Sequence, residues 1–81
     1  MENRVAVIAI IVEDISMAAS VNNILHEYGK HIIGRMGLPC RERNISIISV
    51  VIDAHPDTIS ALSGKIGRLD GVSAKAVYSK N

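Results

Sequence analysis

Apolar residues follow a short period in three parts of the chain, and this pattern predicts strands. Residues 4–12, RVAVIAIIV, are apolar at both odd and even positions, which is typical of a strand covered on both faces. Residues 45–53, ISIISVVID, show the same pattern. Residues 72–78, VSAKAVY, instead alternate apolar residues with charged or small ones, as an exposed edge strand does. The sequence therefore predicts two central strands and one edge strand.

Two amphipathic helices are predicted between these strands. The apolar stripe of the first recurs at intervals of three and four residues and consists of Met17, Val21, Ile24, Leu25 and Tyr28. Ser16 is its expected N-cap, and Gly29 its expected end. In the second helix, Pro56 suits the first position with His55 as the cap before it, and Gly71 is expected to stop it. Its buried stripe consists of Ile59, Leu62, Ile66 and Leu69.

A weaker strand is predicted over residues 31–38, HIIGRMGL. Gly34 and Gly37 interrupt this segment, and glycine weakens strand pairing because it has no side chain to pack. The two glycines therefore indicate a bend or a position at the edge of the sheet. Residues 39–44, PCRERN, form a polar turn, so this strand and the one over 45–53 are expected to make a hairpin.

The predicted order is βαββαβ, which is the order of a ferredoxin-like α+β fold. Right-handed crossovers place both helices on one face of an antiparallel sheet with strand order 4-1-3-2. Residues 1–81 are too few for two separate cores, so we expect a single domain. In this order the strands over 4–12 and 45–53 are central, in agreement with their two apolar faces.

Two helices can cover only one face of such a sheet. On the first strand, one face carries Val5, Val7, Ala9 and Ile11, and the other carries Ala6, Ile8, Ile10 and Val12. We assign to the uncovered face Ile8, Ile10, Ile45, Ile47 and Val51, although a shift of one residue exchanges the two faces. An apolar face of this size is expected to be covered by a second copy of the chain, in a dimer or a tetramer.

Composition and charge exclude several classes of protein. The chain has nine basic and eight acidic residues and a formal net charge of +1, without the basic bias that nucleic-acid binding needs. The longest apolar run, residues 5–12, is far shorter than the roughly 18 residues that span a bilayer. Residues 1–4 lead into this run without a signal-peptide pattern. The single cysteine, Cys40, fits a reducing compartment, so we expect a cytoplasmic protein.

Reactive side chains do not have the spacing of a metal or catalytic site. The three histidines and Cys40 are scattered, without an HxH or CxxC pair, so no metal site within one chain is expected. A metal site shared between subunits stays open. Cys40 lies beside Arg41 and Arg43, but no histidine and acid are placed to support nucleophilic catalysis. No phosphate-binding loop is present. The chain is therefore not expected to be an enzyme, and the sequence identifies no cofactor.

Candidate ligand-binding residues lie in the turn after the first strand and near the hairpin. Arg35, Arg41 and Arg43 are able to grip a carboxylate or phosphate bidentately, although a solvated turn that discourages edge aggregation also explains them. The complete set that we expect to contact a small ligand consists of Glu13, Asp14, Ile15, Ser16, Gly34, Arg35, Gly37 and Arg41.

Several strings carry a resemblance to a known family. They are GRMGLP at 34–39, RER at 41–43, the strand over 45–53, ALSGK at 61–65 and LDGV at 69–72. With these strings the chain resembles the small ACT-like proteins described as regulators of the iron-only hydrogenase system, along nearly its whole length. The resemblance implies an ACT-like ferredoxin fold, an oligomer and a regulatory role. It does not name a ligand.

The leading hypothesis is a regulatory module that responds to a small ligand, which binds near residues 13–16 and the second strand and favours one arrangement of the subunits. The alternative is a protein-interaction module that pairs with a partner, such as another regulatory protein, through its sheet edges and has no small ligand. An enzyme is the third reading, because ferredoxin-like folds also host catalysis.

Overall fold

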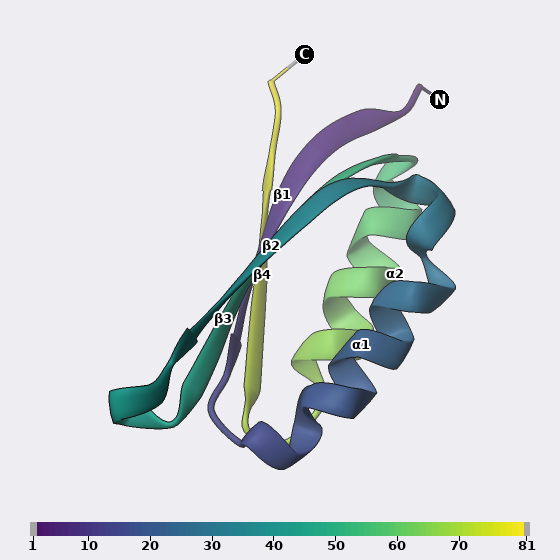
Figure 1. The fold of residues 1–81 in the computed structure, drawn as a ribbon. Helices are drawn as coiled ribbons and strands as arrows, with labels where there is room; N and C mark the ends of the chain where they lie inside the picture. Colours follow the sequence, from purple (N-terminus) through teal and green to yellow (C-terminus); the bar gives the residue numbers. More distant parts are fainter. Residues whose placement is uncertain (1, 81) are drawn as a thin grey trace.

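The computed structural model describes residues 2–80, and within them the chain has the predicted order of elements (Figure 1). The strands are β1 (Arg4–Val12), β2 (Ile32–Cys40), β3 (Ile45–Ala54) and β4 (Val72–Tyr78). The helices are α1 (Ala18–Glu27) and α2 (Pro56–Gly67). Short 3₁₀ turns lie at η1 (Ile15–Met17), η2 (Gly29–His31) and η3 (Arg41–Arg43). No helix in the described part of the chain has the length and hydropathy to cross a membrane.

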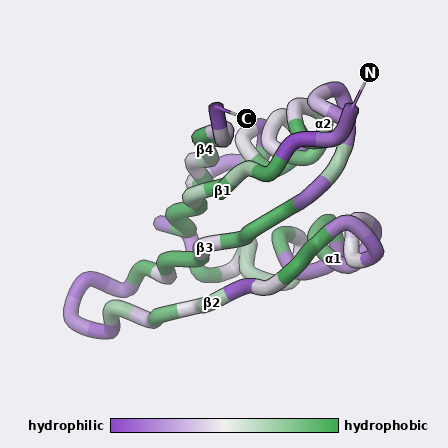
Figure 2. Tube along the Cα trace, turned by 90° about the horizontal axis from the view of Figure 1, so that it is seen from above, coloured by the Kyte–Doolittle hydropathy of each residue, from purple (hydrophilic) through white to green (hydrophobic). Residues whose placement is uncertain are grey.

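The sheet is antiparallel throughout, and its strand order is β2-β3-β1-β4, which is the predicted order read from the other edge. Both helices lie on one face of the sheet (Figure 1). Seen from above, α1 lies on the side of β2 and α2 on the side of β1 and β4 (Figure 2). The β2–β3 hairpin extends beyond the helices at one end. The ferredoxin-like α+β fold is confirmed.

The core lies between the helices and one face of the sheet. Register explains its composition, since Ile8 lies opposite Val50 and Ile10 opposite Ile48, and directly opposed residues point to the same face. The helices contribute to this core Val21, Leu25, Ile59, Leu62 and Ile66, all of them buried. Burying one such side chain contributes roughly 1.5–3 kcal/mol, so this layer is the main source of stability.

The prediction for the uncovered face is wrong on β1. Ile8 and Ile10 are fully buried beneath the helices, at 0% exposure. The β1 residues on the uncovered face are Val5, Val7 and Ile11, each 39% exposed. On β3 the predicted residues do have the parity of the uncovered face, which carries Ile45, Ile47 and Val51. Both parities of β1 are apolar, so hydropathy alone does not distinguish them, and an error of one residue exchanges the two faces.

The caps of the helices agree with the prediction at α2 but not at α1. His55 caps α2, and its Nδ1 accepts a hydrogen bond from the Asp57 amide at 3.0 Å. Ser16 does not cap α1. Asp14 caps η1 instead, because its carboxylate accepts hydrogen bonds from both the amide and the hydroxyl of Ser16, at 3.0 and 2.6 Å. The regular helix therefore begins two residues after Ser16.

Other boundaries differ by a few residues. The first helix ends at Glu27, and Gly29 begins the η2 turn. The second helix ends at Gly67, before the predicted stop at Gly71. As predicted, β2 lies at an edge, but it continues to Cys40 and so takes in Pro39. Proline is tolerated there because an edge strand leaves some N–H groups unpaired.

Gly71 ties the turn after β1 to the start of β4. Its carbonyl accepts hydrogen bonds from the amides of Glu13 and Asp14, at 2.7 and 3.2 Å. Its φ is +72°, and a Cβ built there would lie 2.6 Å from the Cβ of Asp14. Both the backbone conformation and this close approach require glycine.

Replacing Gly71 with alanine is therefore expected to lower the free energy of unfolding by about 1–3 kcal/mol from backbone strain, with a further loss from the contact with Asp14. Urea unfolding measures the change. Gly29→Ala is the matched control, because a Cβ at Gly29 meets nothing within 4 Å. Equal stabilities of the two variants would contradict this account of Gly71.

Candidate functional site

The eight predicted ligand-binding residues fall in three separate places. Residues 13–16 form the turn after β1, beside Gly71. Gly34, Arg35 and Gly37 lie along β2, and Arg41 lies at the tip of the hairpin. Five residues of extended strand separate Arg35 from the end of β2, a distance of about 16 Å. The structure therefore does not bring the eight residues into one site.

Most polar groups of the turn at residues 13–16 already have partners within the chain. The amides of Glu13 and Asp14 both donate to the Gly71 carbonyl, and the Asp14 carboxylate accepts from Ser16. Ile15 is exposed. These bonds fix the shape of the turn, so a ligand there would contact groups other than these two amides.

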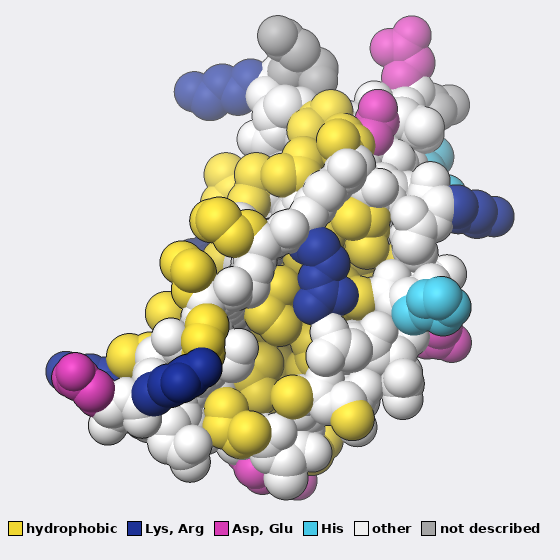
Figure 3. Space-filling model, in the orientation of Figure 1, with side chains coloured by type: hydrophobic (Ala, Val, Ile, Leu, Met, Phe, Trp, Pro, Cys, Tyr) yellow, Lys and Arg dark blue, Asp and Glu magenta, His cyan; other side chains and the backbone are white. Residues whose placement is uncertain are grey.

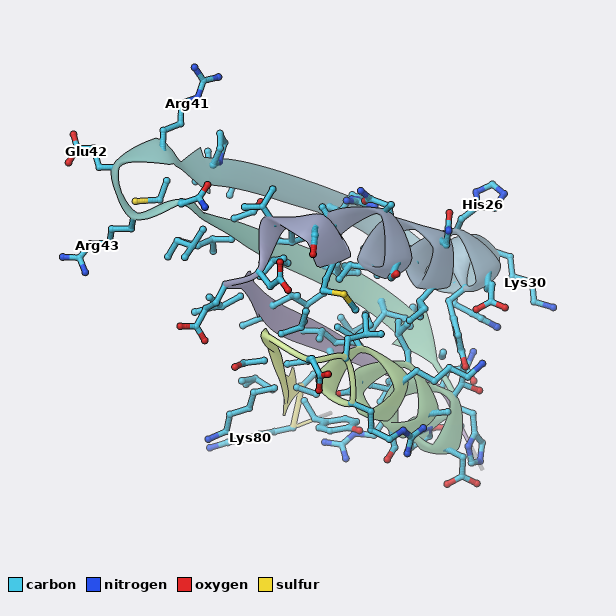
Figure 4. The ribbon with its side chains drawn as sticks, turned by 90° about the horizontal axis from the view of Figure 1, so that it is seen from below. His26, Lys30, Arg41, Glu42, Arg43 and Lys80 are labelled. Carbon is cyan, nitrogen blue, oxygen red and sulfur yellow. The ribbon has the colours of Figure 1, made fainter. Side chains whose placement is uncertain are left out.

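The predicted basic trio does not converge. Arg41 and Arg43 project from the hairpin tip in different directions, with Glu42 between them, while His26 and Lys30 lie at the far end of the molecule (Figure 4). Arg35 points elsewhere, since Val50, its partner in the register, is buried beneath the helices. A small anion therefore cannot contact Arg35 and the two tip arginines together.

Arg35 instead crosses from β2 to α1. Its Nη2 donates a hydrogen bond of 2.7 Å to Oδ1 of Asn22 on α1. Beside this bridge lies a pocket of about 280 Å³, lined by Asn22, Leu25, His26, Gly29, Ile32 and Arg35. On the same side of the molecule, a basic side chain lies over hydrophobic surface between β2 and α1 (Figure 3). We call this cavity the Arg35 pocket.

Near the Arg35 pocket, β2 contributes few side chains toward α1. Gly37 lies opposite the buried Ile48 and so faces the helices, yet it has no side chain. A Cβ at this position would have no neighbour within 4 Å. A β-bulge lies between Ile32 and Gly34, next to the lining residue Ile32, and bulges bend a strand. The buried Leu25 and the half-buried Ile32 supply the apolar part of the lining.

Of the six lining residues, only Arg35 was predicted from the sequence. Asn22 and His26 are four residues apart on α1, so they share one face of the helix, and this spacing is visible in the sequence. Which strand lies beside that face depends on the tertiary structure. The contributions of Gly29 and Ile32 depend on the η2 turn, which the sequence pattern does not indicate.

A second feature is the apolar face of the sheet that the helices leave uncovered. We call it the open face, and its exposed large residues are Val5, Val7, Ile11, Met36, Leu38, Ile47 and Val77. Register aligns them in rows across the strands: Leu38, Ile47 and Ile11 form one row, and Val51, Val7 and Val77 form another. Between these two apolar rows lies a mixed row of Met36, Ser49, Ala9 and Lys75.

The chain and its fold are matched by known proteins. A family model described as "TM1266-like: Iron-only hydrogenase system regulator, putative" matches residues 4–76. The chain belongs to the TM1266-like family. Its structure is similar to that of uncharacterized protein TM1266 from Thermotoga maritima, with 44% sequence identity and a TM-score of 0.92, over 98% of this chain and 100% of that one. A search of curated proteins found no match.

Membership of the TM1266-like family confirms the resemblance seen in the sequence. The family description is that of a regulator, which agrees with the regulatory class expected for this chain. The description names no ligand, so the ligand has to be argued from the residues.

Metal-binding side chains of this TM1266-like chain are dispersed. Within residues 2–80, no three His, Cys, Asp or Glu side chains gather where they could hold one ion. Cys40 is a free, half-buried thiol at the end of β2. Because transition metals need three or four converging protein ligands, a metal site would have to be completed by another subunit.

Treatment with EDTA is therefore expected to leave the melting temperature unchanged, because structural metals stabilise the fold only where a full ligand set exists. Differential scanning fluorimetry before and after dialysis against EDTA tests this. A lower melting temperature that one particular divalent metal restores would instead demonstrate a site shared between subunits.

Proposed function

We propose that this TM1266-like chain is a homo-oligomeric regulatory module whose subunits associate through the open face and which responds to a small ligand. The observation that carries the proposal is the row of exposed residues Leu38, Ile47 and Ile11, which continues across three strands. Contiguous apolar surface on a small protein usually marks an interaction site. The regulatory class is supported by the family description.

A second copy of the chain is the occupant that best fits the open face. A twofold axis through the sheet would bring two identical apolar surfaces together, which makes the contact self-complementary. With four strands of up to about nine residues, the face measures roughly 20 by 30 Å in projection. Because the side chains project unevenly, the accessible area of the face is larger than its projection. It is comparable to the roughly 800 Å² per partner that a standard interface buries.

The edges of the sheet are less suited to association than its face. At β2, a bulge and Pro39 interrupt the row of backbone donors. At the opposite edge, β4 carries the exposed Lys75, and lysine on an edge strand opposes pairing with another chain. Lys75 lies opposite Ala9, so its charge also borders the open face. These features favour association through the face over a module that binds partners by adding a strand.

Ligand response in such a module requires that the ligand bind one arrangement of the subunits more tightly than another. No covalent chemistry is needed. This agrees with the description of the family as a regulator.

Ile11→Lys is expected to dissociate the assembly and leave the fold intact, because it places a charge on the open face, where burial of an unpaired charge costs several kcal/mol. Ile10→Lys is expected to unfold the subunit, because Ile10 is buried beneath the helices. Light scattering measures the mass, and circular dichroism measures the fold.

Ile15→Lys provides a matched control. Ile15 is exposed to a similar degree as Ile11, but it lies in η1 and not on the sheet. Its substitution is expected to leave the mass unchanged. A monomeric unmodified protein, or an Ile11→Lys variant that keeps the mass of the unmodified protein, would overturn the proposed assembly.

A further inference from the structure

We infer that the Arg35 pocket binds a small aliphatic carboxylate, with the guanidinium of Arg35 holding the carboxylate and the apolar lining holding the alkyl chain. The inference deepens the proposed function and rests on it, since it names the site and chemical class of the ligand to which the module would respond. Three features of the pocket support the inference: its charge, its shape and its position along α1.

The charge of Arg35 has no acidic partner among the described residues. In the part of the chain that the structure describes, the recorded ion pair joins His55 and Asp57, and Arg35 bonds only the neutral Asn22. A guanidinium has five N–H donors in a planar fork, so several of them stay available beside the Asn22 bond. None of the six lining residues is acidic. The pocket therefore favours an anion, and a carboxylate matches the fork bidentately.

Arg35 already has one hydrogen-bond partner before any ligand binds. The exposed hydrogen bond to Asn22 restrains the guanidinium beside the pocket, between an edge strand and a helix. An exposed arginine normally loses side-chain freedom on binding, and a pre-ordered one loses less. Asn22 thus acts as a positioning residue for Arg35.

The remainder of the pocket is suited to a short hydrocarbon chain. Leu25 is buried, Ile32 is half-buried, and Gly29 adds no side chain. At about 280 Å³, the pocket is at or below the lower end of the range of about 300–1,000 Å³ for ligand sites. An acid of about six carbons suits this space better than a large cofactor does.

The direction of the ligand follows from the helix dipole. The C-terminus of α1 carries partial negative charge, which disfavours an anion within the last turn. Asn22 lies six residues before Tyr28, the C-cap, which is about 9 Å along the helix. A carboxylate beside Asn22 and Arg35 avoids this charge, and the alkyl chain then extends toward Leu25 and Gly29.

The test is a titration of the full-length protein with sodium hexanoate, followed by ¹⁵N–¹H NMR. Shifts of the Gly29 and Ile32 amides are expected to saturate at millimolar hexanoate, because the pocket is open and the anchor is one guanidinium. Arg35→Gln is expected to weaken binding about tenfold or more, because it removes the charge and the bidentate contact. Asn22→Ala should cause a smaller loss through the position of Arg35. Arg41→Gln, at the hairpin tip, is the control and should bind as the unmodified protein does.

Two further probes separate the parts of the inference. Hexylamine has the same chain without the carboxylate and should not shift Gly29. Inorganic phosphate should bind more weakly than hexanoate because it makes no use of Leu25 and Ile32. Equal binding of phosphate would overturn the aliphatic class of ligand. No saturable shift with hexanoate, or equal losses in Arg35→Gln and Arg41→Gln, would overturn the site.

The failure of this site and the failure of the proposed function are distinguishable by mass. If hexanoate binds as expected to a protein that light scattering shows to be monomeric, the assembly is wrong and the pocket stands. If an oligomer forms through the open face and hexanoate does not bind at Gly29, the pocket is wrong and the assembly stands.

Discussion

Two helices can cover only one face of a four-stranded sheet. The rest of this structure depends on that constraint. The central strands β1 and β3 are apolar on both faces. The helices bury one parity of β1, which includes Ile8 and Ile10, and leave the other, which includes Val7 and Ile11, exposed to solvent in a single copy. Among the described residues 2–80, both helices lie on the other face of the sheet. The proposed association of subunits would cover this apolar parity of the two central strands.

The small number of elements also explains the space left beside β2 on the helix-covered side of the sheet. The buried strand residues belong to β1, β3 and β4, and β2 lies at the edge, where Gly37 contributes no side chain. The Arg35 side chain extends across this space to Asn22 and fills it only in part. The pocket thus lies beside the edge strand β2.

The sequence predicted the order of the elements, the strand order of the sheet, the edge position of β2 and the cap at His55, because each depends on a local pattern. It did not settle which parity of β1 faces the helices, since both are apolar and the choice is made by packing. The Arg35 pocket was found only in part. Arg35 stood out by its charge, but Asn22 and His26 became candidates only once α1 was placed beside β2.

The two proposed sites share one strand, and this suggests how they are coupled. Side chains alternate along β2, so Arg35 faces α1 while its neighbour Met36 belongs to the open face. A ligand that holds Arg35 against α1 restrains the same backbone that presents Met36 and Leu38 to a partner subunit. Because β2 is an edge strand with a bulge, its backbone has fewer constraints than β1 or β3. If the β2 backbone takes different positions with and without ligand, and these positions fit a partner subunit differently, ligand affinity and subunit affinity become linked. The linkage acts equally in both directions.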